Sequence, residues 1–144
     1  MDEVWAFEHS ILCPVSREFA WRFWTNVANW KLDPDIESVT LDGGFEAGTR
    51  GITQSKSSGQ IQWQIAEAQT GRAVLEFNAA GALAQFVWTF EDADSHTKIT
   101  QRSILSGEQA RELAEGVAPT MQAGILAGMR KLCDAMELAA RELS

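Results

Sequence analysis

The last third of the sequence, residues 106–143, constrains the fold more than any other stretch. Ser106 and Gln109 have the spacing of a capping box, and the residues that follow are nearly all strong helix formers. Because Pro119 removes one helical hydrogen bond, we expect it to kink or restart the helix after Gly116, with a lighter segment at 107–117 and a main helix from about residue 119 onward. The main helix would be roughly 35 Å long, so the rest of the chain should wrap around it. Apolar residues recur along this stretch at helical spacing, at Leu113, Val117, Met121, Ile125, Met129, Leu132, Met136, Ala139 and Leu143.

Two glycines on one face of this helix require an explanation. Gly124 and Gly128 each cost about 1 kcal/mol relative to alanine in a helix interior. We therefore expect a packing reason, either a close approach of the helix backbone to a strand or space left for another molecule. The charged residues that follow, from Arg130 to Glu137, exclude a membrane helix that dimerises through its glycines.

Upstream of this helix the apolar pattern changes to a period of two, which is typical of strands. A helix at 17–27 and a short helical turn at 26–34 separate the first two strands. Short links between the later strands indicate an antiparallel meander. The sequence therefore predicts one α+β domain over residues 1–144, with a seven-stranded antiparallel sheet around the C-terminal helix. The predicted strands are 4–13, 36–41, 48–55, 60–68, 72–79, 82–91 and 96–105.

Composition argues against several classes of function. With 45% hydrophobic and 22% charged residues, the chain resembles an ordinary soluble globular domain. Its formal net charge of −8 argues against binding nucleic acid or an anionic membrane through a basic surface. The N-terminal residues do not have the pattern of a signal peptide, and no apolar run approaches membrane-spanning length. Cys13 and Cys133 lie far apart in the sequence, so we expect two reduced thiols in a cytoplasmic protein.

Sequence motifs for metals and cofactors are absent. The chain has no His/Cys/Asp cluster at metal-ligand spacing, no phosphate-binding glycine loop before a helix and no Gly-x-Ser-x-Gly motif. We therefore expect no metal and no cofactor. The chain also has no Tyr, a common acid in aromatising enzymes, so an enzyme here would act mainly by holding its substrate in a shaped cavity.

The order of several motifs resembles a known superfamily. Ile11-Leu-Cys-Pro14 leads into Phe19 and Trp24, and Trp30 with Asp33-Pro34 precedes the second strand. The segment 43–50, Gly-Gly-Phe-Glu-Ala-Gly-Thr-Arg, follows that strand, and a long helix closes the chain. Over essentially its whole length the chain resembles the START-related ligand-binding domains, the SRPBCC superfamily, which includes polyketide cyclases and the birch-pollen allergen. The resemblance implies a helix-grip fold, in which a curved antiparallel sheet grips the C-terminal helix with a cavity between them. It implies no single activity, since the superfamily holds carriers, cyclases, hydrolases and chaperone co-activators.

Two arrangements remain open for the space between sheet and helix. The large rings of the strands could interdigitate with the small residues of the helix into a solid core, or the helix could leave room for a ligand. The methionines of the helix suit varied apolar ligands, and the resemblance favours an apolar cavity with a few polar groups. The expected ligand-binding residues are Phe7, Trp24, Trp30, Trp63, Phe77, Phe86, Trp88, Gln101, Ser103, Met121, Gly124, Ile125, Gly128 and Met129.

Three hypotheses for function follow. The first is intracellular binding of a small hydrophobic ligand, such as a lipid or a polyketide, with no nucleic-acid or integral-membrane partner. The second is a polyketide cyclase-like or dehydratase-like enzyme that uses the same cavity, with His9 on the inner face of the first strand as general base. His9 could equally be a core residue, and Gln101 and Ser103 could bond a neighbouring strand or a buried water. The third is an interaction module in which an exposed aromatic helix at 17–30 docks a partner protein. Ligand identity and oligomeric state stay open at this point.

Overall fold

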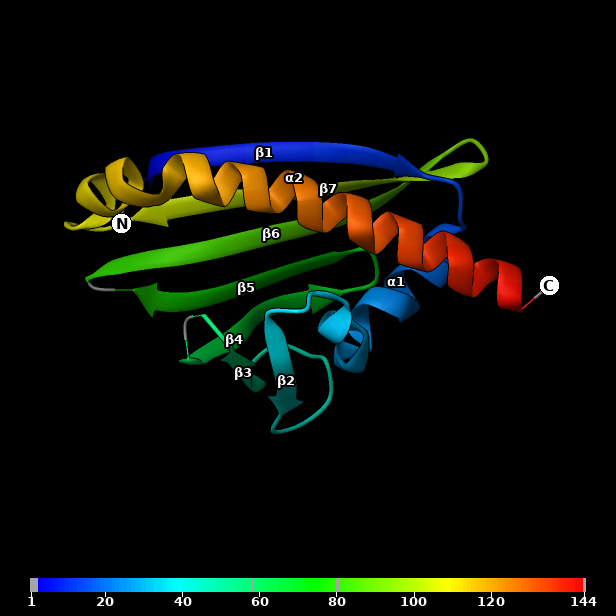
Figure 1. Ribbon diagram of the computed structural model, residues 1–144, viewed down its shortest axis with the longest axis horizontal. Coiled ribbons are helices and arrows are strands. Elements are labelled where there is room, and N and C mark those ends of the chain that lie inside the picture. Colours follow the sequence, from blue (N-terminus) through cyan, green and yellow to red (C-terminus); the bar gives the residue numbers. More distant parts are fainter. Residues whose placement is uncertain (1–2, 58, 80, 144) are drawn as a thin grey trace.

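The computed structural model describes residues 3–57, 59–79 and 81–143 (Figure 1). Its elements follow the predicted order of one strand, two short helices, six strands and a long helix. They are β1 (Glu3–Cys13), α1 (Arg17–Thr25), the 3-10 helix η1 (Val27–Leu32), β2 (Ile36–Leu41), β3 (Arg50–Ser55), β4 (Gly59–Gln69), β5 (Arg72–Ala79), β6 (Ala82–Ala93), β7 (His96–Ser106) and α2 (Ala110–Glu142).

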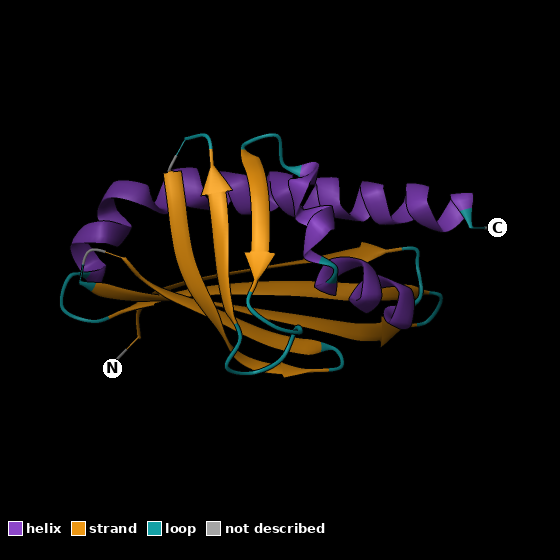
Figure 2. Cartoon of the chain, turned by 90° about the horizontal axis from the view of Figure 1, so that it is seen from below, coloured by secondary structure: helices purple, strands orange, loops and turns teal. Residues whose placement is uncertain are grey.

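All seven strands form one antiparallel sheet in the order β1-β7-β6-β5-β4-β3-β2. Strands β2 to β7 form the predicted meander, and α1 with η1 carries the chain from β1 at one edge to β2 at the other. β4 has an irregularity between Ile65 and Glu67, and a bulge of this kind bends a strand. Figure 2 shows the curved sheet, with some strands turned across the others and the long helix lying along it. The predicted α+β architecture is confirmed.

The start of α2 differs from the prediction. Ser106 is the last residue of β7, where it pairs with Glu3 of β1 and Leu83 of β6. Gly107, with a φ of 102°, then turns the chain, and the helix begins at Ala110 with no side-chain cap from Gln109. The predicted capping box is therefore wrong, because β7 is flanked on both sides and its pairing extends through Ser106.

Of the two alternatives predicted at Pro119, a kink or a restart of the helix, the restart is wrong, because Pro119 lies inside one continuous helix. Ala110 and Ala114 are buried against Leu105 and two alanines of β6, so packing on the sheet holds the first turns in place. In Figure 2 these turns lie at an angle to the rest of α2, so the helix bends without ending. Within the part of the chain that the structure describes, no helix combines the length and apolar character needed to cross a membrane.

The predicted alternation of the strands is confirmed on the sheet face that α2 covers. Ile65, Phe90 and Ile99 come from three different strands and are almost completely buried. They belong to the same core cluster as Met129 and Met136 of α2. The core thus lies between the curved sheet and the middle and later turns of the helix.

Helix α1 is fixed to the sheet by capping and by one arginine. The hydroxyl of Ser16 accepts a hydrogen bond from the backbone N–H of Phe19 at 3.1 Å, as expected of an N-cap. Arg17 donates from Nε to the carbonyl of Phe90 at 2.7 Å and from Nη2 to the carbonyl of Thr70 at 3.0 Å. These contacts place α1 at the end of the sheet, where its aromatic face turns inward.

The aromatic residues at 17–30 do not form an exposed docking surface. Trp24 is only 3% exposed, and its ring centroid lies 5.0 Å from that of Trp88 and 5.3 Å from that of Phe45. The other rings of the segment are all at least half-buried, so the third hypothesis loses the feature on which it rested. These other rings are Phe19, Trp21, Phe23 and Trp30.

Candidate functional site

A pocket of about 620 Å³ lies between the sheet, η1 and α2. This volume is within the range of sites for small molecules. Exposed residues of η1 and α2, among them Leu32, Gly124 and Lys131, mark its mouth. The lining is mostly apolar and consists of Trp24, Asn29, Trp30, Leu32, Asp33, Ile36, Leu75, Phe86, Trp88, Gln101, Met121, Gly124, Ile125, Ala127, Gly128, Met129, Lys131 and Leu132.

Helix α2 supplies one wall of the pocket through residues four positions apart. Residues at this spacing lie on the same helix face, so the helical period alone brings them to the pocket. Ile125 and Met129 are buried and anchor this wall to the core, whereas Gly124 and Gly128 beside them are exposed. The wall therefore passes from packed side chains to a bare strip of helix at the mouth.

The space beside Gly124 and Gly128 decides between the two reasons considered for them. A Cβ atom at either position would meet no heavy atom within 4 Å. The helix backbone therefore makes no close approach to a strand there. Of the two explanations, free space next to the helix is the one that fits.

Tryptophan rings on fixed supports form the opposite wall. Trp30 donates from Nε1 to the carbonyl of Trp24 at 2.7 Å, and its ring stacks on that of Trp63 with centroids 5.4 Å apart. Trp63 in turn donates from Nε1 to the hydroxyl of Thr53 at 3.0 Å. Because both indole N–H groups are satisfied and the rings are stacked, this wall is held in one position.

Gly51 of β3 provides the room for Trp63. A Cβ atom at this position would lie 2.3 Å from Cζ2 of the Trp63 ring, which is far inside van der Waals contact. Gly51 and Trp63 are paired residues of β3 and β4, so the ring lies directly over the glycine. The absence of a side chain at Gly51 thus supports the tryptophan wall from behind.

Polar groups occur among the inner-face residues of β7. Gln101 lines the pocket and is 8% exposed, while Ser103, two residues further on, is 1% exposed. The Oγ atom of Ser103 has no hydrogen-bond partner among the described residues. His9 of β1 is the cross-strand partner of Gln101 and is half-buried, as its predicted inward direction requires, but it does not line the pocket.

The pocket brings together part of the predicted set of ligand-binding residues. Four predicted residues, Phe7, Phe77, Trp63 and Ser103, are not part of the lining. Phe77 packs against Phe86 with ring centroids 5.9 Å apart, and Trp63 stacks behind Trp30. Phe7 and Ser103 are paired with each other further along β1 and β7. The predicted residues that do line the pocket are Trp24, Trp30, Phe86, Trp88, Gln101, Met121, Gly124, Ile125, Gly128 and Met129.

Sequence reasoning missed the residues around the mouth. Asn29 and Asp33 flank Trp30 in the η1 region, and their signal was proximity to a predicted site residue in a tight turn. Lys131 follows Gly124 and Gly128 at helical spacing, so the same helix period could have identified it. The remaining omissions are Leu32, Ile36, Leu75, Ala127 and Leu132.

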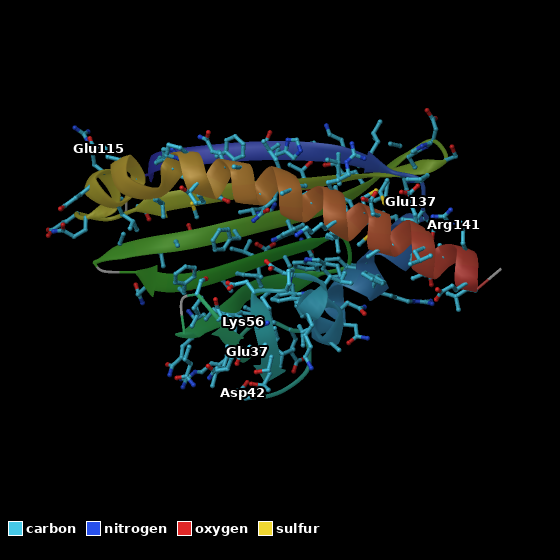
Figure 3. The ribbon with its side chains drawn as sticks, viewed as in Figure 1. Glu37, Asp42, Lys56, Glu115, Glu137 and Arg141 are labelled. Carbon is cyan, nitrogen blue, oxygen red and sulfur yellow. The ribbon has the colours of Figure 1, made fainter. Side chains whose placement is uncertain are left out.

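Titratable groups with shifted pKa values lie away from the pocket. Cys13 donates from Sγ to the carbonyl of Cys133 at 3.6 Å, and burial raises the pKa of both thiols. Hydrogen bonds from Ser55 and Ser57 lower the pKa of Asp35. Charged side chains such as Glu115 on α2 and Glu37 on β2 point outward, as Figure 3 shows. Within the described lining, charge comes from Asp33 and Lys131 alone, and both are exposed.

Comparison with known proteins gives likeness in structure alone. No protein-family model and no curated protein matches the sequence. The crystal structure of Ara h 8.0201 superposes with a TM-score of 0.75 at 16% identity, over 92% of this chain and 97% of that chain. Norcoclaurine synthase from Thalictrum flavum gives 0.73 at 14% identity, over 94% and 88% of the two chains. The di-domain ARO/CYC StfQ from the steffimycin biosynthetic pathway gives 0.75 at 9% identity, over 94% of this chain and 51% of that chain.

These three proteins share the birch-pollen-allergen-like helix-grip fold of the SRPBCC superfamily. The resemblance noted in the sequence is confirmed at the level of the fold. At such low identity the comparisons carry no residue roles to this chain.

Proposed function

We propose that this chain binds a small hydrophobic molecule in the pocket between the sheet, η1 and α2. The observation that carries the proposal is an apolar pocket with free space beside two helix glycines. Gly124 and Gly128 lower the stability of the helix relative to alanine, and neither allows a close packing contact. A molecule bound in the pocket beside them would account for both glycines.

The character of the walls supports this proposal. Trp24, Trp30 and Trp88 offer large apolar surfaces, and the two methionines of α2 can adapt their shape to a ligand. The solved structures that share the fold include norcoclaurine synthase and an ARO/CYC protein, and their names denote proteins that act on small organic molecules. We also propose that the ligand is met inside the cell, where the thiols of Cys13 and Cys133 would stay reduced.

Binding is a better account of the pocket than catalysis. His9, the candidate base, is absent from the lining, although it lies on the same sheet face as Gln101. A general base must come within hydrogen-bond reach of the proton it removes. The variant His9→Gln tests this interpretation. It should leave ligand affinity within about fivefold of the wild-type value, as expected for a residue outside the binding surface.

The proposal can be tested with the neutral fluorescent probe N-phenyl-1-naphthylamine. Gly128→Leu would place a branched side chain in the free space at the mouth, and we expect probe affinity to fall at least about tenfold. Gly116→Leu is the matched control. Gly116 lies on the same helix with nothing within 4 Å of a Cβ atom, but it does not line the pocket.

Both leucine variants should remain folded, since each replaces glycine by a better helix former. Circular dichroism and the urea midpoint check this directly. The proposal is wrong if the wild-type protein does not bind the probe, or if folded Gly128→Leu binds it as tightly as Gly116→Leu does.

A further inference from the structure

The inner face of β7 carries a buried glutamine whose amide has no hydrogen-bond partner among the described residues. Gln101 is 8% exposed and lines the pocket, and its side chain makes no hydrogen bond to any of the described residues. A primary amide provides two donors and an acceptor, and burying these groups without partners is unfavourable. Gln101 lines the pocket, so a molecule in the pocket could provide the partner that the described residues do not.

The next inward position of the same strand repeats this arrangement. Ser103 is 1% exposed, and its Oγ atom has no hydrogen-bond partner in the described part of the chain. Its neighbours across the sheet are Phe7 and Phe86, so an apolar residue would have suited the site equally well. Gln101 and Ser103 are thus two successive inward positions of β7 whose polar groups have no partner among the described residues, whereas the hydroxyl of Thr97 on the same strand bonds the carbonyl of Val15.

The charges around the pocket restrict what these groups can meet. Asp33 and Lys131, the charged residues of the described lining, are exposed at the mouth, and Gln101 is buried in the sheet. His9, the cross-strand partner of Gln101, does not line the pocket. Moving an ionised group into an apolar site without a counter-charge is far more costly than moving a hydroxyl or a carbonyl. A group that reaches Gln101 should therefore be polar and neutral.

We propose that the ligand is a neutral, mainly apolar molecule with a hydroxyl or carbonyl oxygen at one end, and that Gln101 hydrogen-bonds this oxygen inside the pocket. The inference rests on the proposed binding function and adds the class and orientation of the ligand. The apolar body lies against Trp24, Trp30 and Trp88, and the oxygen is directed toward β7. Hydrocarbons would leave the amide unpartnered, and carboxylates would bring an uncompensated charge.

Two probes of equal shape isolate this hydrogen bond. 2-Naphthol and 2-methylnaphthalene differ by a hydroxyl in place of a methyl group, and their affinities can be measured by displacement of N-phenyl-1-naphthylamine. Gln101→Met keeps the size of the side chain and removes both polar groups. Relative to the wild type, the preference for 2-naphthol over 2-methylnaphthalene should fall about tenfold, or about 1.4 kcal/mol. Gln62→Met, at an exposed position of β4 outside the lining, should leave the preference unchanged.

Two further measurements need only the wild-type protein, so they hold even if Gln101→Met does not fold. The side-chain amide signals of Gln101 in NMR spectra should shift with 2-naphthol well beyond any shift with 2-methylnaphthalene. 2-Naphthoate should bind at least about tenfold more weakly than 2-naphthol, because its carboxylate stays ionised.

The outcomes separate this inference from the function on which it rests. Equal preference in wild type and Gln101→Met, equal NMR shifts, or tight binding of 2-naphthoate would overturn the inference while hydrophobic binding stands. If neither naphthalene nor N-phenyl-1-naphthylamine binds the wild type, the proposed function fails and the inference fails with it.

Discussion

Replacing glycine by alanine should have opposite effects at two positions of this protein. At Gly51 the new methyl group would lie 2.3 Å from Cζ2 and 2.4 Å from Cε2 of Trp63, where van der Waals contact requires 3.4 Å or more. The ring cannot move aside easily, because Trp63 is stacked on Trp30 and hydrogen-bonded to Thr53. Overpacking of this kind costs about 1–3 kcal/mol, so Gly51→Ala should lower the free energy of unfolding by at least that amount.

Gly128→Ala provides the contrast, because its methyl group would enter open space on a helix. The gain in helix propensity should raise the free energy of unfolding by about 1 kcal/mol. Urea titrations followed by circular dichroism measure both variants under identical conditions.

A double-mutant cycle tests the stated cause at Gly51. Trp63→Leu removes the ring that the methyl group would strike, so Gly51→Ala should cost much less in that background. If Gly51→Ala is neutral in the wild-type background, or costs the same with Leu at position 63, the ring contact does not explain the glycine.

Further predictions concern the helix bend, the thiols and one carboxylate. Amide hydrogen exchange should be faster over residues 110–118 than over 120–142, because Pro119 interrupts the hydrogen-bond ladder between them, and equal protection would show one uniformly stable helix. Burial raises the pKa of Cys13 and Cys133 above the usual 9.0, so as the pH rises these thiols ionise in the unfolded protein before they ionise in the folded one. Their contribution to the free energy of unfolding should be fully present below about pH 9. Above that pH it should fall by up to about 1.4 kcal/mol per pH unit for each thiol. Urea titrations from pH 8 to 10 should show a shallower loss in a Cys13→Ala/Cys133→Ala variant. Because the pKa of Asp35 is lowered below 3.8, its contribution is present above that pH and is lost as the pH falls through the folded value, so Asp35→Asn should flatten the acid limb of the stability curve.

The fold was predictable from the sequence because period and order carried it. Alternation at period two identified every strand to within a few residues, and the helical period identified α2. These signals arise from burial on one face, which the sequence records directly. The position of β1 beside β7 was given by no local pattern, because it depends on where α1 and η1 carry the chain.

Errors occurred where local chemistry competed with long-range pairing. Ser106 is a residue type that often caps helices, yet β1 and β6 both pair with its strand and extend β7 to that residue. Pro119 normally ends a helix, yet the buried alanines before it hold the first turns against the sheet. In each case the local sequence favours one backbone structure, but packing and pairing with residues distant in the sequence determine which structure forms.

The candidate site was predictable to the extent that a residue's direction determines its surroundings. Inner-face direction was right for His9 and Phe7, but both lie outside the lining. The period of the apolar residues shows which face of the sheet a side chain occupies. It does not show how far along the strand the pocket lies or how close the side chain comes to α2. For the same reason Lys131 was missed, since a charged residue on a helix resembles a solvated one until the position of the mouth is known.

The persistence of an open pocket in this core needs a physical cause on each side, because an apolar cavity is unfavourable and side chains tend to fill it. On the sheet side, Trp30 and Trp63 are held by stacking and by hydrogen bonds to fixed oxygens, so neither ring can swing into the space. On the helix side, Gly124 and Gly128 have no side chains with which to fill it. Collapse would then require α2 to move toward the sheet as a whole, which the packing of Met129 and Met136 opposes. The space is thus maintained from both sides, as the proposed binding of a hydrophobic molecule requires.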